Sequence, residues 1–469
     1  MKTLKTTIIY LIATIVEKGL GFLLIPLYTH YLSTYDYGIL TLIQAFIAVI
    51  VILFSLSLTG AGSRYHFEIE SNLYRNLHYG NIYAVILIIS LVVGLILFLL
   101  KDWLFQIIGD IPVKPYFYLA INIAFLMLVF NIYQLKLQME HRAIEYSINS
   151  ISKFFLGAIF SILMVVYLNK KADGVLLGQL IGLVLITFYI LFRLKDEIKL
   201  NLNKKLVKRN IKYSIFLVPH NLSGIAMQLM DRFFISNMLN VSQAGIYALG
   251  GQITSILGIL NVLFNRAFTP NILKAFKDKN YIYLKNLASI NILFISTTGL
   301  FFSLFSENII CLIAPKEYEK AFVVINILSF YFIYQMYYFM TVGVLFYVEK
   351  ATKFIPFITT LSLFLNLIFN YFFIKLFGIM GAALATSLSM MIVNYIVIFI
   401  ADKYIKVGFE HLKIHFFIIF SLSVGNSIFI FKFNIFIKSL LFIFTLILFL
   451  YMERKNFLLK QFLKKVKFG

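Results

Sequence analysis

Two pairs of opposite charges stand inside stretches of sequence that are otherwise apolar. Glu17 and Lys18 are adjacent in the first such run, and Asp231 and Arg232 are adjacent in the seventh. A charge in the hydrocarbon core of a bilayer is costly, so such residues usually face the protein interior and are candidates for function. Neighbours on a helix point about 100° apart and pair poorly with each other. The pattern therefore allows two predictions. One is static ion pairs between the two runs, in which each acid pairs with the base of the other run. The other is a substrate site, in which the bases contact an anionic substrate and the acids couple transport to protons or sodium.

Two arginines at the ends of apolar runs offer a second anion contact. Arg64 stands in the segment Gly60-Ala-Gly-Ser-Arg-Tyr-His, and Arg266 stands in Asn265-Arg-Ala-Phe-Thr-Pro. The planar guanidinium fork suits the oxygens of a pyrophosphate, although each arginine alone is more typical of an anchor at the basic face of a membrane protein. The predicted substrate contacts are Lys18, Arg64, Arg232 and Arg266, and the predicted ion-coupling residues are Glu17 and Asp231.

The sequence lacks the motifs of a cofactor site. Cys311 is the single cysteine, so no internal disulfide can form, and no Cys/His cluster has the spacing of a metal site. There is also no P-loop for nucleotide hydrolysis. We therefore expect no metal or other cofactor, and energy from an ion gradient or from downhill consumption of the substrate.

The elements that must position these residues are membrane helices. Of the 469 residues, 61% are hydrophobic and 13% are charged, and the mean hydropathy is +0.90. A spanning helix needs about 20 mostly apolar residues, and fourteen such runs are found. The last two are interrupted by Lys432 and Lys438, so a twelve-helix arrangement stays open. The predicted fold class is an all-α polytopic membrane protein.

The net charge of +22 is a topology signal. Basic residues are concentrated in alternate loops, namely those that lie on the same side of the membrane as the amino terminus. The positive-inside rule assigns such loops to the cytoplasm. We therefore expect a multi-pass protein of the cell membrane with both termini cytoplasmic, and no nucleic-acid partner.

An internal repeat is suggested by two matches at one offset of 207 residues. Leu32, Gly38 and Leu42 align with Leu239, Gly245 and Leu249, and Gly174 aligns with Gly381. A parallel repeat of this kind is typical of transporters with a site between the halves, and simple reuse of small residues at helix crossings is the alternative. The expected domains are an amino-terminal lobe at 1–193, a basic linker at 194–212, a second lobe at 213–401, and a helix pair with a basic tail at 402–469.

Amides and short outer loops favour transport over catalysis. The predicted spans contain many Asn and Gln residues, which together suggest a polar passage for a sugar-like head, although any one of them is more typical of a hydrogen bond between helices. The outer loops are about 15 residues or fewer, too short for the catalytic loop expected of a membrane glycosyltransferase. We therefore predict that the protein is not an enzyme.

Several motifs resemble those of a known family. The segment from Gly21 to Leu40 contains Leu-Ser-Thr-Tyr-Asp-Tyr-Gly, and Asp231-Arg-Phe-Phe-Ile precedes Ala244-Gly-Ile-Tyr-Ala-Leu. Ala314-Pro-Lys-Glu-Tyr-Glu-Lys-Ala adds a third motif. These resemble the polysaccharide transporters, including Wzx-type O-antigen flippases, of the multidrug/oligosaccharidyl-lipid/polysaccharide (MOP) flippase superfamily.

The resemblance implies two pseudo-symmetric six-helix lobes that form a V-shaped central cavity, with a carboxy-terminal helix pair. It implies a flippase that works by alternating access on an undecaprenyl pyrophosphate-linked glycan, for O-antigen, capsule or exopolysaccharide synthesis. Membrane lipids, a proton or sodium ion, and the polysaccharide polymerase machinery are the implied partners. A multidrug and toxic-compound cation antiporter and a lipid II flippase are the alternatives.

Overall fold

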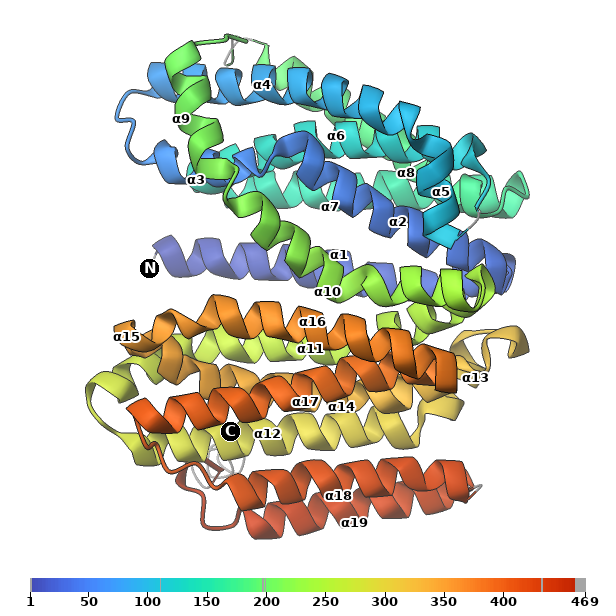
Figure 1. Ribbon diagram of the computed structural model, residues 1–469, viewed down its shortest axis with the longest axis vertical. Helices are drawn as coiled ribbons and strands as arrows, with labels where there is room; N and C mark the ends of the chain where they lie inside the picture. Colours follow the sequence, from blue (N-terminus) through green and yellow to red (C-terminus); the bar gives the residue numbers. More distant parts are fainter. Residues whose placement is uncertain (1, 110, 196–197, 199, 432, 460–469) are drawn as a thin grey trace. The chain divides into compact units, whose positions relative to one another are not determined.

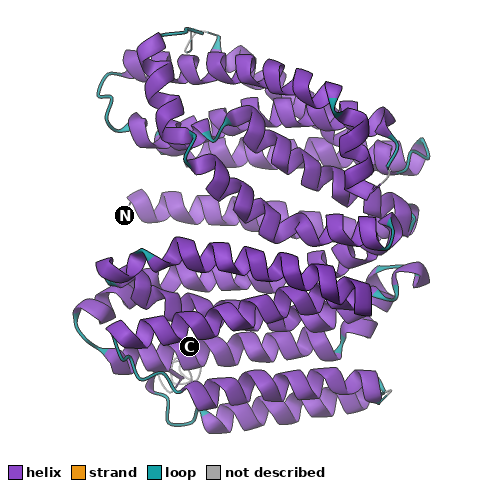
Figure 2. Ribbon diagram, viewed as in Figure 1, coloured by secondary structure: helices purple, strands orange, loops and turns teal. Residues whose placement is uncertain are grey.

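Helices make up all the regular structure in the described part of the chain (Figure 1, Figure 2). The structure is a computed structural model that describes residues 2–109, 111–195, 198, 200–431 and 433–459. Parts of the predicted basic linker and most of the basic tail, residues 460–469, lie outside these ranges. Long apolar helices satisfy their backbone hydrogen bonds internally, which a bilayer requires.

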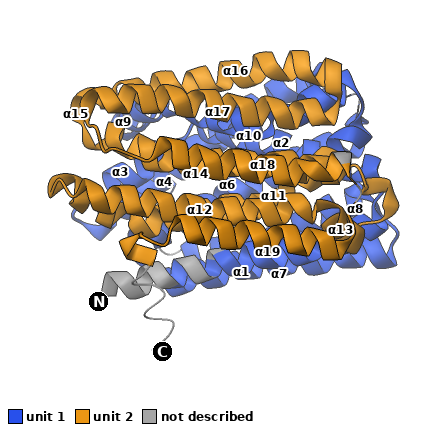
Figure 3. Cartoon of the chain, turned by 90° about the horizontal axis from the view of Figure 1, so that it is seen from below, with its two compact units in different colours: residues 1–245 blue, residues 246–469 orange. Residues whose placement is uncertain are grey.

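The chain divides into two compact units, residues Met1–Gly245 and Ile246–Gly469 (Figure 3). The helices of the first unit are α1 (Lys2–Tyr31), α2 (Thr34–Ser55), α3 (Leu58–His66), α4 (Asn72–Leu99), α5 (Lys101–Gly109), α6 (Val113–Met139), α7 (Ala143–Ile162) with the π-helical turn η1 (Leu163–Tyr167), α8 (Ala172–Leu194), α9 (Lys204–Ser214) and α10 (Leu217–Met238). Helix α11 (Val241–Lys277) begins in the first unit and continues into the second.

The second unit continues with nine further elements. They are α12 (Tyr281–Leu304), α13 (Ser306–Ile313), the 3-10 turn η2 (Lys316–Tyr318), α14 (Ala321–Tyr347), α15 (Glu349–Thr352), α16 (Phe354–Phe377), α17 (Ile379–Tyr404), α18 (His411–Ile430) and α19 (Ile435–Met452). The domain boundaries expected from the repeat stay a prediction, and α9 and α10 belong to the first compact unit.

Twelve helices of the described chain are long and apolar enough to cross a membrane. Both α18 and α19 are among them, so the lysines near the last two runs do not disqualify those helices. Helices α1 and α10, which carry the two charged pairs, are not among the twelve. The all-α polytopic membrane fold is confirmed, and the number of spans stays a prediction.

The Ser-Thr-Tyr-Asp-Tyr-Gly motif starts α2. The Ser33 hydroxyl accepts a hydrogen bond from the Asp36 backbone N–H (3.2 Å), and the Asp36 carboxylate accepts one from the Ser33 backbone N–H (3.3 Å). This reciprocal capping box satisfies two donors at the helix start. Gly38 follows one turn into the helix, and a Cβ atom there would lie 2.1 Å from the Val241 carbonyl oxygen. The motif thus begins α2 and places a residue without a side chain, Gly38, where the backbone at the start of α11 comes close.

One helix hairpin in each unit packs through a glycine. Helix α8 lies against α7, and a Cβ atom on Gly178 would lie 2.1 Å from the Ser161 backbone nitrogen. Helix α17 lies against α16, and a Cβ atom on Gly381 would lie 1.9 Å from the Phe373 carbonyl oxygen. Small residues that let backbones approach closely are typical of membrane helix packing.

Polar groups join the α18–α19 pair to α12 and α13 at both ends. At one end the fully buried carboxylate of Glu453 contacts Lys413 and the Ser289 hydroxyl. At the other end the Lys438 ammonium lies 2.8 Å from a Glu307 carboxylate oxygen. Lys438 therefore does not interrupt α19, because its charge is paired.

Candidate functional site

Glu17 pairs with Lys153 on the neighbouring α7. Their carboxylate and ammonium groups are 3.3 Å apart, and the Lys153 ammonium also lies 4.7 Å from the centre of the Phe130 ring on α6. The expected pairing of Glu17 with Arg232 is therefore wrong. The physical reason is that α1 packs along α7, which places Lys153 beside the acid. Lys18 is exposed, so the adjacent pair leaves a cation at the helix surface.

Asp231 and Arg232 lie on α10, which packs against α2 within the first unit. Asp231 is buried, with 4% of its surface exposed, whereas Arg232 is half-buried. Arg232 lies close enough to Tyr37 on α2 for its charge to act on the tyrosine hydroxyl. The two residues thus differ in environment: the acid is inside the unit and the base is partly accessible.

Arg64 lies on α3 between two tyrosine rings. Its guanidinium carbon is 5.1 Å from the centre of the Tyr213 ring and 6.0 Å from that of Tyr65. It also approaches Glu68 at 3.8 Å, with both side chains about half exposed. An exposed pair of this kind contributes little to stability, so the guanidinium can exchange Glu68 for another anion.

Arg209 on α9 joins the same group and was not predicted. Its guanidinium carbon lies 4.1 Å from the centre of the Tyr65 ring. Its Nε and Nη2 atoms are buried without a hydrogen-bond partner. We call Arg64, Tyr65, Arg209 and Tyr213 the α3–α9 cluster. A partial signal was available, because Arg209 and Tyr213 stand four residues apart and share a helix face.

A network of asparagine amides holds α9 in place. The Asn203 side chain caps the helix by accepting from the Lys205 and Leu206 N–H groups at 3.0 and 3.3 Å. Asn210 donates to the Asn81 side chain on α4 at 3.3 Å. Asn201, just before the helix, donates to the Leu77 carbonyl oxygen at 2.7 Å. The predicted linker therefore contains a helix that is folded onto α3 and α4.

Arg266 lies on α11 in the second unit and is exposed. Arg266 forms no ion pair with another residue in the described part of the chain. Its predicted role in substrate binding stays a prediction.

Several amides that were candidates for a polar passage instead connect helices. Asn261 on α11 donates to the Phe332 carbonyl (2.8 Å) and the Gln335 side chain (3.0 Å) on α14. Asn370 donates to Asn366 on the same helix, and Asn366 donates to Thr386 on α17 at 3.1 Å. These groups are buried within the second unit, where a hydrogen bond between helices is their principal use.

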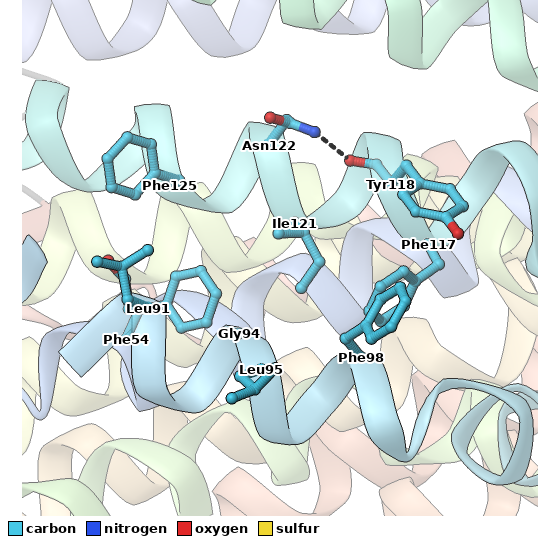
Figure 4. A pocket seen from close by; sticks show the side chains of 11 residues that line it. Phe54, Leu91, Gly94, Leu95, Phe98, Phe117, Tyr118, Ile121, Asn122 and Phe125 are labelled. Atoms are coloured by element: carbon cyan, nitrogen blue, oxygen red, sulfur yellow. Dashed lines mark hydrogen bonds between the residues drawn. The ribbon is translucent and has the colours of Figure 1, made fainter. Parts of the chain in front are cut away.

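The first unit also carries an apolar pocket of about 460 Å³ (Figure 4). Asn122 lies at its edge and donates to the Tyr118 carbonyl at 2.8 Å, so its amide is satisfied locally. No charged side chain lines the pocket, and it therefore suits a hydrocarbon chain and not a phosphate group. The residues around it include Phe54, Leu91, Leu95, Phe98, Phe117 and Phe125.

Comparison with known proteins gives matches over most of the chain. The family model described as polysaccharide biosynthesis protein matches residues 3–276. The chain is 26% identical over 329 residues to Lsg locus putative protein 1 of Haemophilus influenzae, covering 68% of this chain and 78% of that protein. It is 23% identical over 461 residues to the probable low-salt glycan biosynthesis flippase Agl15 of Haloferax volcanii, covering 96% of this chain and 94% of that protein.

Solved transporter structures share the fold. The lipid II flippase MurJ in an inward closed conformation is similar with a TM-score of 0.73 and 17% identity, covering 96% of this chain and 99% of that one. An inward-facing multidrug resistance MATE family transporter of the MOP superfamily is similar with a TM-score of 0.63 and 16% identity, covering 87% of this chain and 98% of that one. At these identities the likeness concerns the fold.

Proposed function

Because the chain belongs to the polysaccharide biosynthesis protein family, we propose that it is a flippase that moves a polyprenyl pyrophosphate-linked oligosaccharide from the cytoplasmic to the outer leaflet. The product would feed the synthesis of O-antigen, capsule or exopolysaccharide. Transport proceeds by alternating access, and the chain does not catalyse a covalent step. Its place is the cell membrane, with both termini cytoplasmic.

The observation that carries the proposal is the set of cations left without a strong acidic partner in the first unit. Glu17 is engaged by Lys153, which leaves Lys18 exposed. Arg64 makes one weak, exposed pair, and Arg209 is absent from the ion pairs of the described chain. A surface with excess positive charge attracts an anionic substrate and disfavours a cationic drug. This supports a pyrophosphate-linked substrate over a cation antiporter.

In the proposed cycle Lys18, Arg64, Arg232 and Arg266 bind the substrate. Asp231 and Glu17 couple the movement to protons or sodium. Asp231 is the better placed of the two acids for this role, because it is buried. A buried carboxylate responds strongly to a change of proton or cation occupancy.

The test is native mass spectrometry of the protein extracted from its own host with its surrounding lipid. Retained polyprenyl pyrophosphate oligosaccharide is the expected result, and its mass would report the sugar composition. A deletion strain should accumulate the same lipid-linked glycan on the cytoplasmic side. Retention of lipid II would identify a lipid II flippase instead. Binding of added cationic drugs, with bulk phospholipid alone retained, would identify an antiporter.

A further inference from the structure

We infer that the α3–α9 cluster is a pyrophosphate-binding site in which Arg209, on the helix between α8 and α10, acts as the second cationic arm beside Arg64. The inference rests on the proposed function, because it assigns the entry site for the substrate's diphosphate. It also adds Arg209, which lies in the predicted linker and not in a predicted span. The linker helix thereby becomes part of the substrate site.

The first argument is the electrostatic state of Arg209. No ion pair in the described chain includes its guanidinium, and two of its nitrogen atoms are buried without an acceptor. A buried donor without a partner is unfavourable in the folded state. An anion that reached the accessible part of this half-buried side chain would supply the missing negative charge.

The second argument is that the two guanidinium groups approach the same tyrosine ring. The Arg209 and Arg64 guanidinium carbons are 4.1 and 6.0 Å from the centre of the Tyr65 ring. The Tyr213 ring supports Arg64 at 5.1 Å. Cation–π contacts limit the motion of a guanidinium without consuming its hydrogen-bond donors. Two oriented forks on neighbouring helices match two linked phosphate groups better than one.

The third argument is that the surroundings are basic and the support is rigid. Lys208 and Lys212 are exposed on the same helix as Arg209, and they add to the local positive potential. Glu68 is the acid that pairs with the cluster, at 3.8 Å from Arg64. The amide network from Asn201 to Asn210 fixes α9 on α4. A preorganised site of this kind loses less conformational entropy when the ligand binds.

The experiment measures binding of inorganic pyrophosphate to the full-length protein in nanodiscs of zwitterionic phospholipid, by isothermal titration calorimetry. We expect Arg209→Gln to weaken binding at least tenfold and Arg209→Lys to weaken it less. Arg64→Gln should act like Arg209→Gln, and orthophosphate should bind at least tenfold more weakly than pyrophosphate. Lys204→Gln removes a charge from the same helix outside the cluster, and should change the affinity less than twofold.

Folding and ligand source are controlled separately. Arg209→Lys keeps a cation over Tyr65 and should keep the melting temperature of the parent, so a loss of affinity in that variant is not a loss of fold. Unchanged pyrophosphate affinity in both Arg209→Gln and Arg64→Gln would overturn the inference. Displacement of pyrophosphate by vesicles of phosphatidylglycerol, but not by a short-chain polyprenyl pyrophosphate, would assign the cluster to bulk anionic lipid and also overturn it.

The outcome is separable from that of the proposed function. If the parent chain exports glycan but replacement of Arg209 leaves the pyrophosphate affinity unchanged, the proposed flippase function stands and this binding site is rejected. If pyrophosphate binding depends on Arg209 but the chain neither retains nor exports a lipid-linked glycan, the binding site stands and the proposed flippase function is rejected.

Discussion

Gly38 on α2 and Gly245 on α11 are in backbone contact. A Cβ atom on Gly245 would lie 2.7 Å from the Gly38 nitrogen, 3.1 Å from the Gly38 Cα atom and 2.2 Å from the Thr34 carbonyl oxygen. The two glycines stand 207 residues apart, which is the offset of the predicted repeat. Each glycine makes room for the backbone of the other helix, and both belong to the first compact unit.

Replacement of Gly245 by alanine should destabilise the first unit. The added carbon collides with backbone atoms that cannot rotate away, and overpacking of this kind costs about 1–3 kcal/mol. The apparent melting temperature of the detergent-solubilised protein should fall. Gly224→Ala is the matched control, because a Cβ atom there meets nothing within 4 Å, and alanine favours the helix by up to about 1 kcal/mol. Equal melting temperatures for the two variants would contradict the contact.

The pair between Lys438 and Glu307 should respond asymmetrically to mutation. Lys438 is 2% exposed, whereas the Glu307 side chain is 44% exposed. Glu307→Ala leaves a buried ammonium with Asn308 (3.1 Å) as its one remaining partner among the described residues, at a cost of about 1–3 kcal/mol. Lys438→Met fills the same space and leaves an acid that water can solvate, so it should cost less than about 1.5 kcal/mol. Thermal unfolding of both single variants and the double variant measures the two losses of stability. A larger loss of stability for Lys438→Met than for Glu307→Ala would contradict this prediction.

Acid should weaken the attachment of α18 to α12. Burial alone would raise the pKa of Glu410, but hydrogen bonds and charges from Lys285 (2.9 Å) and Lys413 (3.0 Å) outweigh it and hold the pKa below its ordinary value. A carboxyl group with a lowered pKa in the folded state stabilises fully above its unfolded pKa of about 4.3, and this contribution is lost as the pH falls further. The difference in melting temperature between the parent and Glu410→Gln should be constant at pH 6–7 and shrink below about pH 4. A constant difference down to pH 3 would argue against the ion pairs.

Lys18 should matter for transport and Lys153 for stability, although both are lysines beside Glu17. Lys18→Gln removes an exposed cation from the proposed substrate path, and a lost hydrogen bond to a charged group corresponds to about tenfold or more in affinity. Glycan export should therefore fall about tenfold with folded protein unchanged. Lys153→Gln leaves Glu17 without its ion-pair partner, and should lower the melting temperature. Export at the parental rate in Lys18→Gln would remove this residue from the site.

The fold was predictable because its signals are local and strong. Continuous apolar runs set the helices, and the segment from Ser33 to Gly38 contains both a capping box and the small residue of a close contact. The sequence leaves α18 and α19 open as membrane helices, because Lys438 interrupts the last apolar run. A single sequence does not show that Glu307, far away in the chain, neutralises it.

The site was predictable in part, because pairing depends on which helices become neighbours. Glu17, Arg64 and Asp231 were selected from charge in an apolar context. The partner of Glu17 was wrong because Lys153 lies on α7, and nothing in the spacing indicates that α1 packs there. Arg209 was hidden among the many basic residues of the linker, where positive charge has a topological explanation of its own.

The attachment of the α18–α19 pair has a consequence for biosynthesis. Lys438 is translated 131 residues after Glu307, and Glu453 follows Ser289 by 164 residues. Until the last two helices are synthesised, the Glu307 carboxylate on α13 and the Ser289 hydroxyl on α12 lack these partners. The final hairpin then inserts its buried lysine beside a counter-ion that is already present. A chain that stops before α18 would therefore lack the buried lysine and the buried carboxylate that join the last two helices to α13 and α12.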